Sequence, residues 1–155
     1  MKIDIEINNR TKTPANISLI KKAAARVIEG EGKRLPGSRG VEVSIALVSL
    51  AKIHQINKKY RKIDRATDVL SFAEDGNAGK QIGYPRFMGE LVICPKQVKD
   101  DAKASELAFE EEMAWAVVHG MLHLFGHDHE KNESQARVMR KKEEFYLSKI
   151  KFKIT

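Results

Sequence analysis

Residues 113–129 read "MAWAVVHGMLHLFGHDH", and this stretch decides the fold prediction. Between residues 113 and 125, only His119, Gly120 and His123 are not strongly apolar. A helix that is apolar on all sides is buried, so we expect a central helix here. The spacing places the imidazoles of His119 and His123 on one face of that helix, about a turn apart. Buried imidazoles without partners would cost about 1 to 3 kcal/mol each, and binding a shared cation would remove that cost.

The turn after this helix supplies a third imidazole. Gly126 is expected to adopt the left-handed conformation that ends a helix, so that His129 turns back toward His119 and His123. Three imidazole nitrogens favour Zn²⁺, and a fourth position open to water or substrate is typical of catalytic zinc. The alternative is a fortuitous cluster of histidines, which burial and spacing make the weaker interpretation.

Two further residues of the turn have roles that the sequence leaves open. His127 has no helical phase to place it, and we expect it to face solvent or to support the metal ligands, with a role as third ligand the lesser alternative. Asp128 either orients a ligand histidine through its ring N–H or is an ordinary turn aspartate.

The histidine spacing also matches the metzincin proteases, which carry H-E-x-x-H-x-x-G-x-x-H. His119, His123, Gly126 and His129 fall on the histidine and glycine positions of that pattern. The glutamate position, however, holds Gly120, and glycine cannot act as the general base that takes a proton from water. A metzincin-like metallohydrolase acting on peptides or small molecules is therefore an alternative that lacks its central residue.

Hydrophobic periodicity predicts the other elements. Alternation and short apolar runs predict strands at residues 2–7, 41–48, 67–72 and 88–94. Helical spacing predicts helices at residues 17–30, 50–62, about 95–104, about 107–125 and about 133–148, the last capped by Asn132 with Gln135 three residues on. Residues 74–87 form a long Gly-rich loop that either shapes a substrate groove or is disordered. The order predicts one α+β domain over residues 1–155, with a small mixed sheet covered by helices.

Composition narrows the partners and the compartment. The chain has 155 residues and a formal net charge of +7, which favours a polyanionic partner such as nucleic acid. Its opening stretch shows no basic segment followed by an apolar one, and it has no run of 18 apolar residues, so we expect no signal sequence and no membrane association. The single cysteine, Cys94, ends an apolar run and is expected to be a buried thiol in a reducing compartment, the cytoplasm.

A cluster of cations follows the helix predicted at residues 50–62. Its members are Lys58, Lys59, Arg61, Lys62 and Arg65. Such a cluster is usually a solvated helix end, where cations also favour the helix dipole. A site that clamps a phosphate, however, needs planar bidentate donors, which a guanidinium supplies and an ammonium does not. We therefore predict Arg61 as a phosphate clamp and the other four as contacts to the backbone of a nucleic acid.

The sequence resembles the YbeY family of bacterial endoribonucleases. "HGMLHLFGHDH" is similar to the family signature H-G-x-L-H-L-x-G-[YH]-D-H, and "INKKYRKIDRATDVLSF" to L-N-x-x-Y-R-x-x-D-x-P-T-D-V-L-S-F. "MGELVIC" resembles the family's L-G-D-I-x-I strand, and Met139, Glu143 and Leu147 its last helix. Ala66 replaces the usual proline and Glu90 the usual aspartate, while His127 stands where tyrosine is common.

The resemblance implies a mostly parallel sheet of four strands with about five helices. It implies one Zn²⁺ held by His119, His123 and His129, with Arg61 near the metal. The implied activity is cleavage of single-stranded RNA in 16S ribosomal RNA 3′-end maturation and ribosome quality control. The implied partners are ribosomal RNA and the ribosome or its small subunit, and we expect no DNA.

The mechanistic hypothesis is that the metal polarises a phosphoryl oxygen or activates a water, while Arg61 stabilises charge on the phosphate. The general base and the nucleophile, water or the RNA 2′-OH, stay open. Asp68 and Asp128 are possible proton acceptors and equally good structural caps. A rival of another class is a non-catalytic, ribosome-associated RNA-binding factor with a structural zinc.

Overall fold

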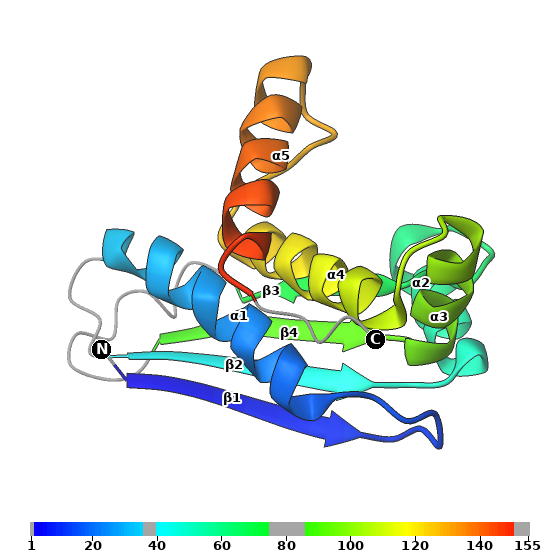
Figure 1. Cartoon of the computed structure of the whole chain (residues 1–155). Coiled ribbons are helices and arrows are strands. Elements are labelled where there is room, and N and C mark those ends of the chain that lie inside the picture. The colour runs from blue at the N-terminus through cyan, green and yellow to red at the C-terminus, as the bar shows by residue number, and fades with distance from the viewer. Residues whose placement is uncertain (1, 36–39, 75–85, 151–155) are drawn as a thin grey trace.

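The computed structural model describes residues 2–35, 40–74 and 86–150 (Figure 1). The strands are β1 (Lys2–Asn9), β2 (Gly40–Leu47), β3 (Val69–Ala73) and β4 (Arg86–Ile93). The helices are α1 (Ile17–Glu31), α2 (Leu50–Arg61), α3 (Pro95–Ala104), α4 (Phe109–Leu124) and α5 (Glu133–Leu147), with a short 3₁₀ helix, η1, at Gly32–Arg34. Most of the loop expected at residues 74–87 lies outside the described residues.

The four strands form one mixed sheet in the order β1-β2-β4-β3. β1 pairs with β2 and β2 with β4 in parallel, and β3 pairs with β4 in antiparallel fashion. The prediction of an α+β fold with a mostly parallel four-stranded sheet and five helices is confirmed. β3 is therefore an edge strand, a position that matters for the site described below.

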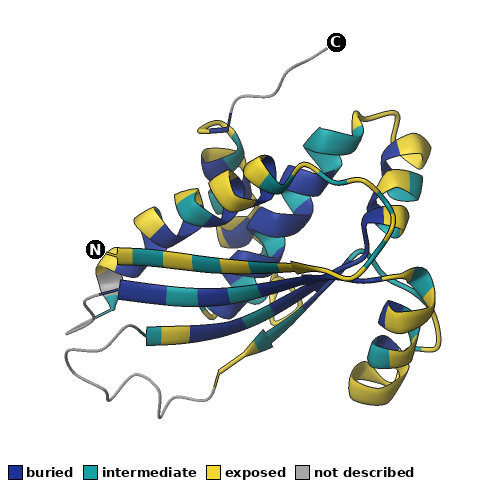
Figure 2. Ribbon diagram, turned by 90° about the horizontal axis from the view of Figure 1, so that it is seen from below, coloured by how far each residue is buried: buried dark blue, intermediate teal, exposed yellow. Residues whose placement is uncertain are grey.

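The main core lies between one face of the sheet and helices α1 and α4, which cover that face in Figure 1, while α5 packs on α1 and α4 and rises away from the sheet. Along β3 and β4, residues alternate between the two faces: Val69 and Leu91 belong to this core, and Leu70 and Val92 to a second cluster. Ile53 of α2 belongs to the second cluster, so α2 packs on the opposite face. Figure 2 views the molecule from that side, where β1 shows exposed and half-buried residues in alternation.

Helix α4 is the central buried helix that the apolar stretch predicted. It lies close to the sheet at Gly120, because a Cβ there would stand 3.0 Å from Leu91 Cδ2 and 3.1 Å from Val69 Cγ2. The Ser71 hydroxyl donates to the Gly120 carbonyl at 3.0 Å and joins β3 to the helix. Position 120 thus faces the sheet, so a glutamate side chain there would enter packed core. This packing is a second argument against a metzincin-like site, in addition to the absence of the glutamate from the sequence.

Helix bounds differ from the predictions by one or two residues. α4 begins at Phe109 rather than Leu107, because the Ala108 N–H is bonded to the side chain of Glu111 at 3.4 Å and marks the cap. α1 continues past Gly30 to Glu31. The predicted Asn132 cap is confirmed, since its side chain accepts from the Gln135 N–H at 2.8 Å. None of the described helices is long and apolar enough to cross a membrane.

Candidate metal centre and active site

The turn after α4 brings the third histidine back toward the helix. Gly126 has a φ of 94°, the left-handed conformation predicted for it. Its N–H donates to the His123 carbonyl at 3.0 Å, and the His127 N–H donates to the Leu122 carbonyl at 3.1 Å. These two bonds form the closure that ends many helices at a glycine. The chain therefore reverses at Gly126, and His129 lies over the face of α4 that carries His119 and His123.

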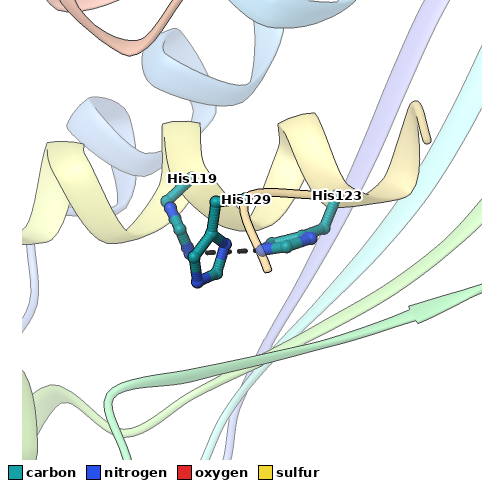
Figure 3. A group of neighbouring side chains, drawn as sticks. All are labelled: His119, His123 and His129. Atoms are coloured by element: carbon teal, nitrogen blue, oxygen red, sulfur yellow. Dashed lines mark hydrogen bonds between the residues drawn. The ribbon is translucent and has the colours of Figure 1, made fainter. Parts of the chain in front are cut away.

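The rings of His119, His123 and His129 converge on one point (Figure 3). One ligand nitrogen from each lies within 4.8 Å of the others, and the Nε2 atoms of His119 and His123 are 3.2 Å apart. Burial lowers the pKa of His123, and the neighbouring His119 and His129 lower it further. His123 is therefore held as the neutral imidazole that a metal requires. The donor set fits a divalent metal that prefers nitrogen ligands.

Two residues, Glu143 and Trp115, hold the His119 ring in position. Its Nδ1 lies 3.3 Å from the Oε2 atom of Glu143, a buried residue of α5. The indole of Trp115, one turn earlier on α4, stacks on the imidazole with ring centroids 4.6 Å apart. A carboxylate on one ring nitrogen selects the tautomer whose other nitrogen is free to bind a metal. Glu143 thus directs Nε2 of His119 toward His123 and His129.

Arg61 and the three histidines line the same pocket, which has a volume of about 400 Å³. Arg61 is the last residue of α2, and its side chain is half-exposed. Its ionic partner is Glu130, which also lines the pocket, with Arg61 Nη2 and Glu130 Oε1 3.7 Å apart. An exposed ion pair at this distance is weak. The Arg61 guanidinium can therefore leave the Glu130 carboxylate and bind a phosphate instead.

The other four predicted cations do not line this pocket. Lys58 lies 3.9 Å from Asp64, and the Lys62 ammonium donates to the Lys59 carbonyl at 3.1 Å. Lys59 lies over the ring of Tyr60, and Arg65 is exposed just beyond the helix. The four therefore surround the end of α2 beside the pocket rather than entering it.

Asp68 and Asp128 each accept a hydrogen bond from a nearby backbone N–H. Asp68 accepts from the Val69 N–H at 2.7 Å, and its carboxylate lies near those of Asp101 and Glu112, outside the lining of the histidine pocket. Burial raises the pKa of Asp68. Asp128 lines the pocket but accepts from the Glu130 N–H at 2.9 Å, as a turn aspartate does.

His127 does not face solvent, contrary to the first expectation for it. Its ring Nε2 lies 2.7 Å from Oε1 of Glu31, and only 15% of its side chain is exposed. Glu31, at the end of α1, also accepts from the Lys142 ammonium at 3.0 Å and from the Tyr146 hydroxyl. The buried carboxylate joins α1, α5 and the turn that carries His129, so His127, which also lines the pocket, anchors that turn.

Comparison with known proteins matches this geometry to a family. The model of the family described as Endoribonuclease YbeY matches residues 6–151. The chain is 35% identical to "Endoribonuclease YbeY" of Chloroflexus aggregans, over 86% of each chain. It is 35% identical to the protein of that name from Thermodesulfovibrio yellowstonii, over 97% of this chain and 99% of that one. The chain belongs to the YbeY endoribonuclease family. A solution structure from Thermotoga maritima has a TM-score of 0.63 and 29% identity, covering 94% of this chain and 88% of that one.

Membership in the YbeY family confirms the resemblance read from "HGMLHLFGHDH" and "TDVLSF". It makes the chain an endoribonuclease, a hydrolase of phosphodiester bonds. Within that family context, the three histidines are a group that could hold a metal ion.

Three residues that support the YbeY site were not singled out as site residues from the sequence. Glu143 appeared only as part of a helix pattern, although a glutamate at a buried position between Met139 and Tyr146 is a usable signal. Glu31 follows a glycine at the end of a helix, and nothing in its local sequence marks it. Trp115 was interpreted only as an apolar residue of α4.

The contact between Glu143 and His119 predicts that a variant without the Glu143 carboxylate binds zinc more weakly. Glu143→Ala is expected to weaken zinc binding by about 10- to 100-fold, because the His119 ring loses the partner that sets its tautomer and orientation. A titration of the metal-free protein against a chromophoric chelator measures this change. Glu144→Ala, at the exposed neighbouring position, is the matched control. Equal affinity in Glu143→Ala and wild type would show that Glu143 has no part in the site.

The Glu31 cluster predicts how stability depends on pH. Burial alone would raise the pKa of Glu31, but hydrogen bonds from Tyr146, His127 and Lys142 outweigh it and lower the pKa from 4.5 to about 2. A carboxyl whose folded pKa lies below its unfolded value stabilises the fold above the unfolded pKa, and this contribution is lost as pH falls. It is worth roughly 3 kcal/mol near pH 7 and disappears between about pH 4.5 and pH 2.

Glu31→Gln is therefore expected to lower the free energy of unfolding by roughly 3 kcal/mol at pH 7, and by progressively less below pH 4.5. Urea unfolding at several pH values, with chelator present so that no metal contributes, measures the difference. Glu29→Gln, at an exposed glutamate two residues earlier, should change stability by less than about 0.5 kcal/mol. A deficit in Glu31→Gln that does not depend on pH would refute the account.

Proposed function

We propose that this chain is a metal-dependent endoribonuclease that cleaves single-stranded RNA, and that its cellular substrate is the 3′ end of 16S ribosomal RNA. The observation that carries the proposal is the convergence of three imidazoles and one arginine on a single pocket. Family membership supports RNA as the substrate, and the formal net charge of +7 suits a polyanion. We include ribosome quality control, association with the ribosome or its small subunit, and location in the cytoplasm, all from the resemblance to the family.

The donor set favours one zinc ion. His119, His123 and His129 would hold it, and three protein ligands leave a tetrahedral metal one position for water or substrate. Zinc at this point would supply Lewis acidity to a phosphoryl oxygen. Glu143 orients His119, and Glu31 anchors the turn of His129 through His127.

Arg61 is the group proposed to bind the scissile phosphate. Its guanidinium lines the pocket with the histidines, so it can donate two parallel hydrogen bonds to phosphate oxygens there. These bonds strengthen as negative charge builds on the phosphate during cleavage. The four cations around the end of α2 are proposed to contact neighbouring phosphates. Binding there depends on charge rather than on a precise hydrogen-bond geometry.

The histidine pocket is recessed below the protein surface, which supports a preference for single-stranded RNA. Only 16% of the His119 side chain is exposed, while His129 at the rim is more open. A flexible strand can bend a phosphate into such a pocket, whereas a duplex holds its phosphates on a regular surface.

A cleavage assay tests the proposal against both rivals. Zinc-loaded protein is expected to cut an end-labelled single-stranded RNA covering the 16S 3′ end, to leave the same sequence intact in a duplex, and to stop when chelator is added. RNA binding without any cutting would favour the binding factor with structural zinc. Metal-dependent peptidase activity without RNA cleavage would favour the metallohydrolase.

A further inference from the structure

A second groove opens on the other face of the sheet, between α2 and the strands β3 and β4. Its volume is about 680 Å³. We call it the aromatic groove, and its lining includes Tyr60, Phe72, Phe87, Lys52, Lys59 and Glu90. Neither the metal nor the phosphate clamp of the proposed function uses it.

The aromatic rings of this groove are unusually open. Tyr60 is 60% exposed, and Phe87 is 36% exposed. The Tyr60 ring meets that of Phe72 edge to face, with centroids 5.4 Å apart and planes at 73°. Phe72 packs against the second core cluster, so it supports the Tyr60 ring from one side without covering it. A fixed, exposed ring is a platform on which a flat ligand can stack.

The aromatic groove adjoins the histidine pocket at the edge strand β3. Ala73 of β3 lines both, and the consecutive residues Tyr60 and Arg61 of α2 line the groove and the pocket respectively. On β3, Ser71 bonds to α4 on the pocket side, while Phe72 lines the groove. β3 is an edge strand, and no described strand lies beyond it. A ligand that leaves the pocket can therefore cross this edge and enter the groove.

The charges that line the groove indicate which part of a nucleotide, the base or the phosphate, it would bind. Lys52 and Lys59 line it, and the Lys59 ammonium lies 5.2 Å from the centre of the Tyr60 ring. Glu74 and Glu90 also line it, and two carboxylates disfavour a phosphate there. Carboxylates accept hydrogen bonds from the amino and imino groups of bases. The arrangement suits a base inside the groove with its phosphates near the lysines.

We propose that the aromatic groove binds an unpaired base of the same RNA strand whose phosphate lies beside Arg61, chiefly by stacking on Tyr60. The inference rests on the proposed function, since it needs RNA in the histidine pocket. It adds a physical reason for a single-strand preference, because a base paired in a duplex has no free face to stack.

Kinetics on the zinc-loaded protein test the groove. Tyr60→Ala is expected to raise KM for a single-stranded RNA decamer about five- to twentyfold with little change in kcat, since one base–aromatic stack is lost. Tyr60→Phe should keep the wild-type KM. With 2-aminopurine in the decamer, wild type and Tyr60→Phe should quench its fluorescence on mixing, and Tyr60→Ala should quench it less. A purely structural role for Tyr60 would not change this signal.

Phe145→Ala is the matched control, because Phe145 is 54% exposed on α5 and has the Lys149 ammonium 5.2 Å from its ring centre. It should behave as wild type. If wild type cleaves the decamer and Tyr60→Ala matches it in KM and quenching, the groove proposal is wrong and the proposed function stands. If wild type cleaves no RNA, the proposed function fails and the groove proposal with it. A dimer in light scattering that Tyr60→Ala converts to a monomer, at unchanged KM, would assign the groove to a second copy.

Discussion

The His119→Ala variant is expected to lose RNA cleavage by roughly a thousandfold or more and to lose zinc at micromolar concentrations. Its imidazole is one of the three that converge, and it is the one fixed from behind by Glu143 and Trp115. Removing it leaves two nitrogen ligands, and loss of a metal's Lewis acidity costs several kcal/mol of transition-state stabilisation. Cleavage rates and the zinc content of dialysed protein measure the two effects.

His54→Ala is the control for this prediction. His54 is the one histidine of the chain outside residues 119–129, and it is half-exposed on α2, with its Nε2 atom 2.6 Å from Asp64 Oδ1. It should keep wild-type zinc content and activity. A His119→Ala protein that folds, binds RNA and still cleaves it at a rate near wild type would remove the histidines from the mechanism.

The Arg61→Ala variant is expected to cleave RNA about 10²- to 10³-fold more slowly, with zinc binding unchanged. Arg61 lines the pocket but is not one of the three histidines that could hold the metal. Its loss should therefore weaken the binding of the phosphate and leave the binding of the metal unchanged. The size follows from the loss of preorganised donors to a charge that develops in the transition state. Arg61→Lys should recover only part of the rate, because an ammonium keeps the charge without the two parallel hydrogen bonds.

Arg140→Ala provides a closely matched control, since Arg140 is exposed on α5 and lies 3.6 Å from Glu133, much as Arg61 lies 3.7 Å from Glu130. Loss of that arginine should leave both cleavage and zinc binding intact. Equal cleavage rates in Arg61→Ala and Arg140→Ala would mean that Arg61 is only one of several surface cations.

Local sequence predicted the elements and the histidine cluster well, for a physical reason. Burial, four-residue spacing and a left-handed glycine all act within residues 113–129, so each can be read without knowing what packs against them. The C-terminal helix was likewise predictable from the Asn132 cap. The strand order β1-β2-β4-β3 depends on long-range pairing and was not predicted, and only the mostly parallel character of the sheet came from the family resemblance.

The supporting residues could not be predicted in this way, because their partners lie far apart in the chain. Glu31 meets His127, Lys142 and Tyr146 only after α1 and α5 pack beside α4. For His127 the sequence left open whether it faces solvent or supports the metal ligands, because its partner Glu31 lies on another helix. Gly120 was interpreted as a missing glutamate, but the structure adds a packing reason, the approach of α4 to Leu91.

The central claim is that His119, His123 and His129 hold one catalytic metal ion beside Arg61. A crystal structure of the zinc-loaded protein, with anomalous diffraction measured on both sides of the zinc edge, tests it most directly. We predict one anomalous peak in the histidine pocket, with three imidazole nitrogens about 2.0 to 2.1 Å away and one position open toward Arg61. No peak at that point, or a carboxylate that closes the coordination shell, would contradict the account.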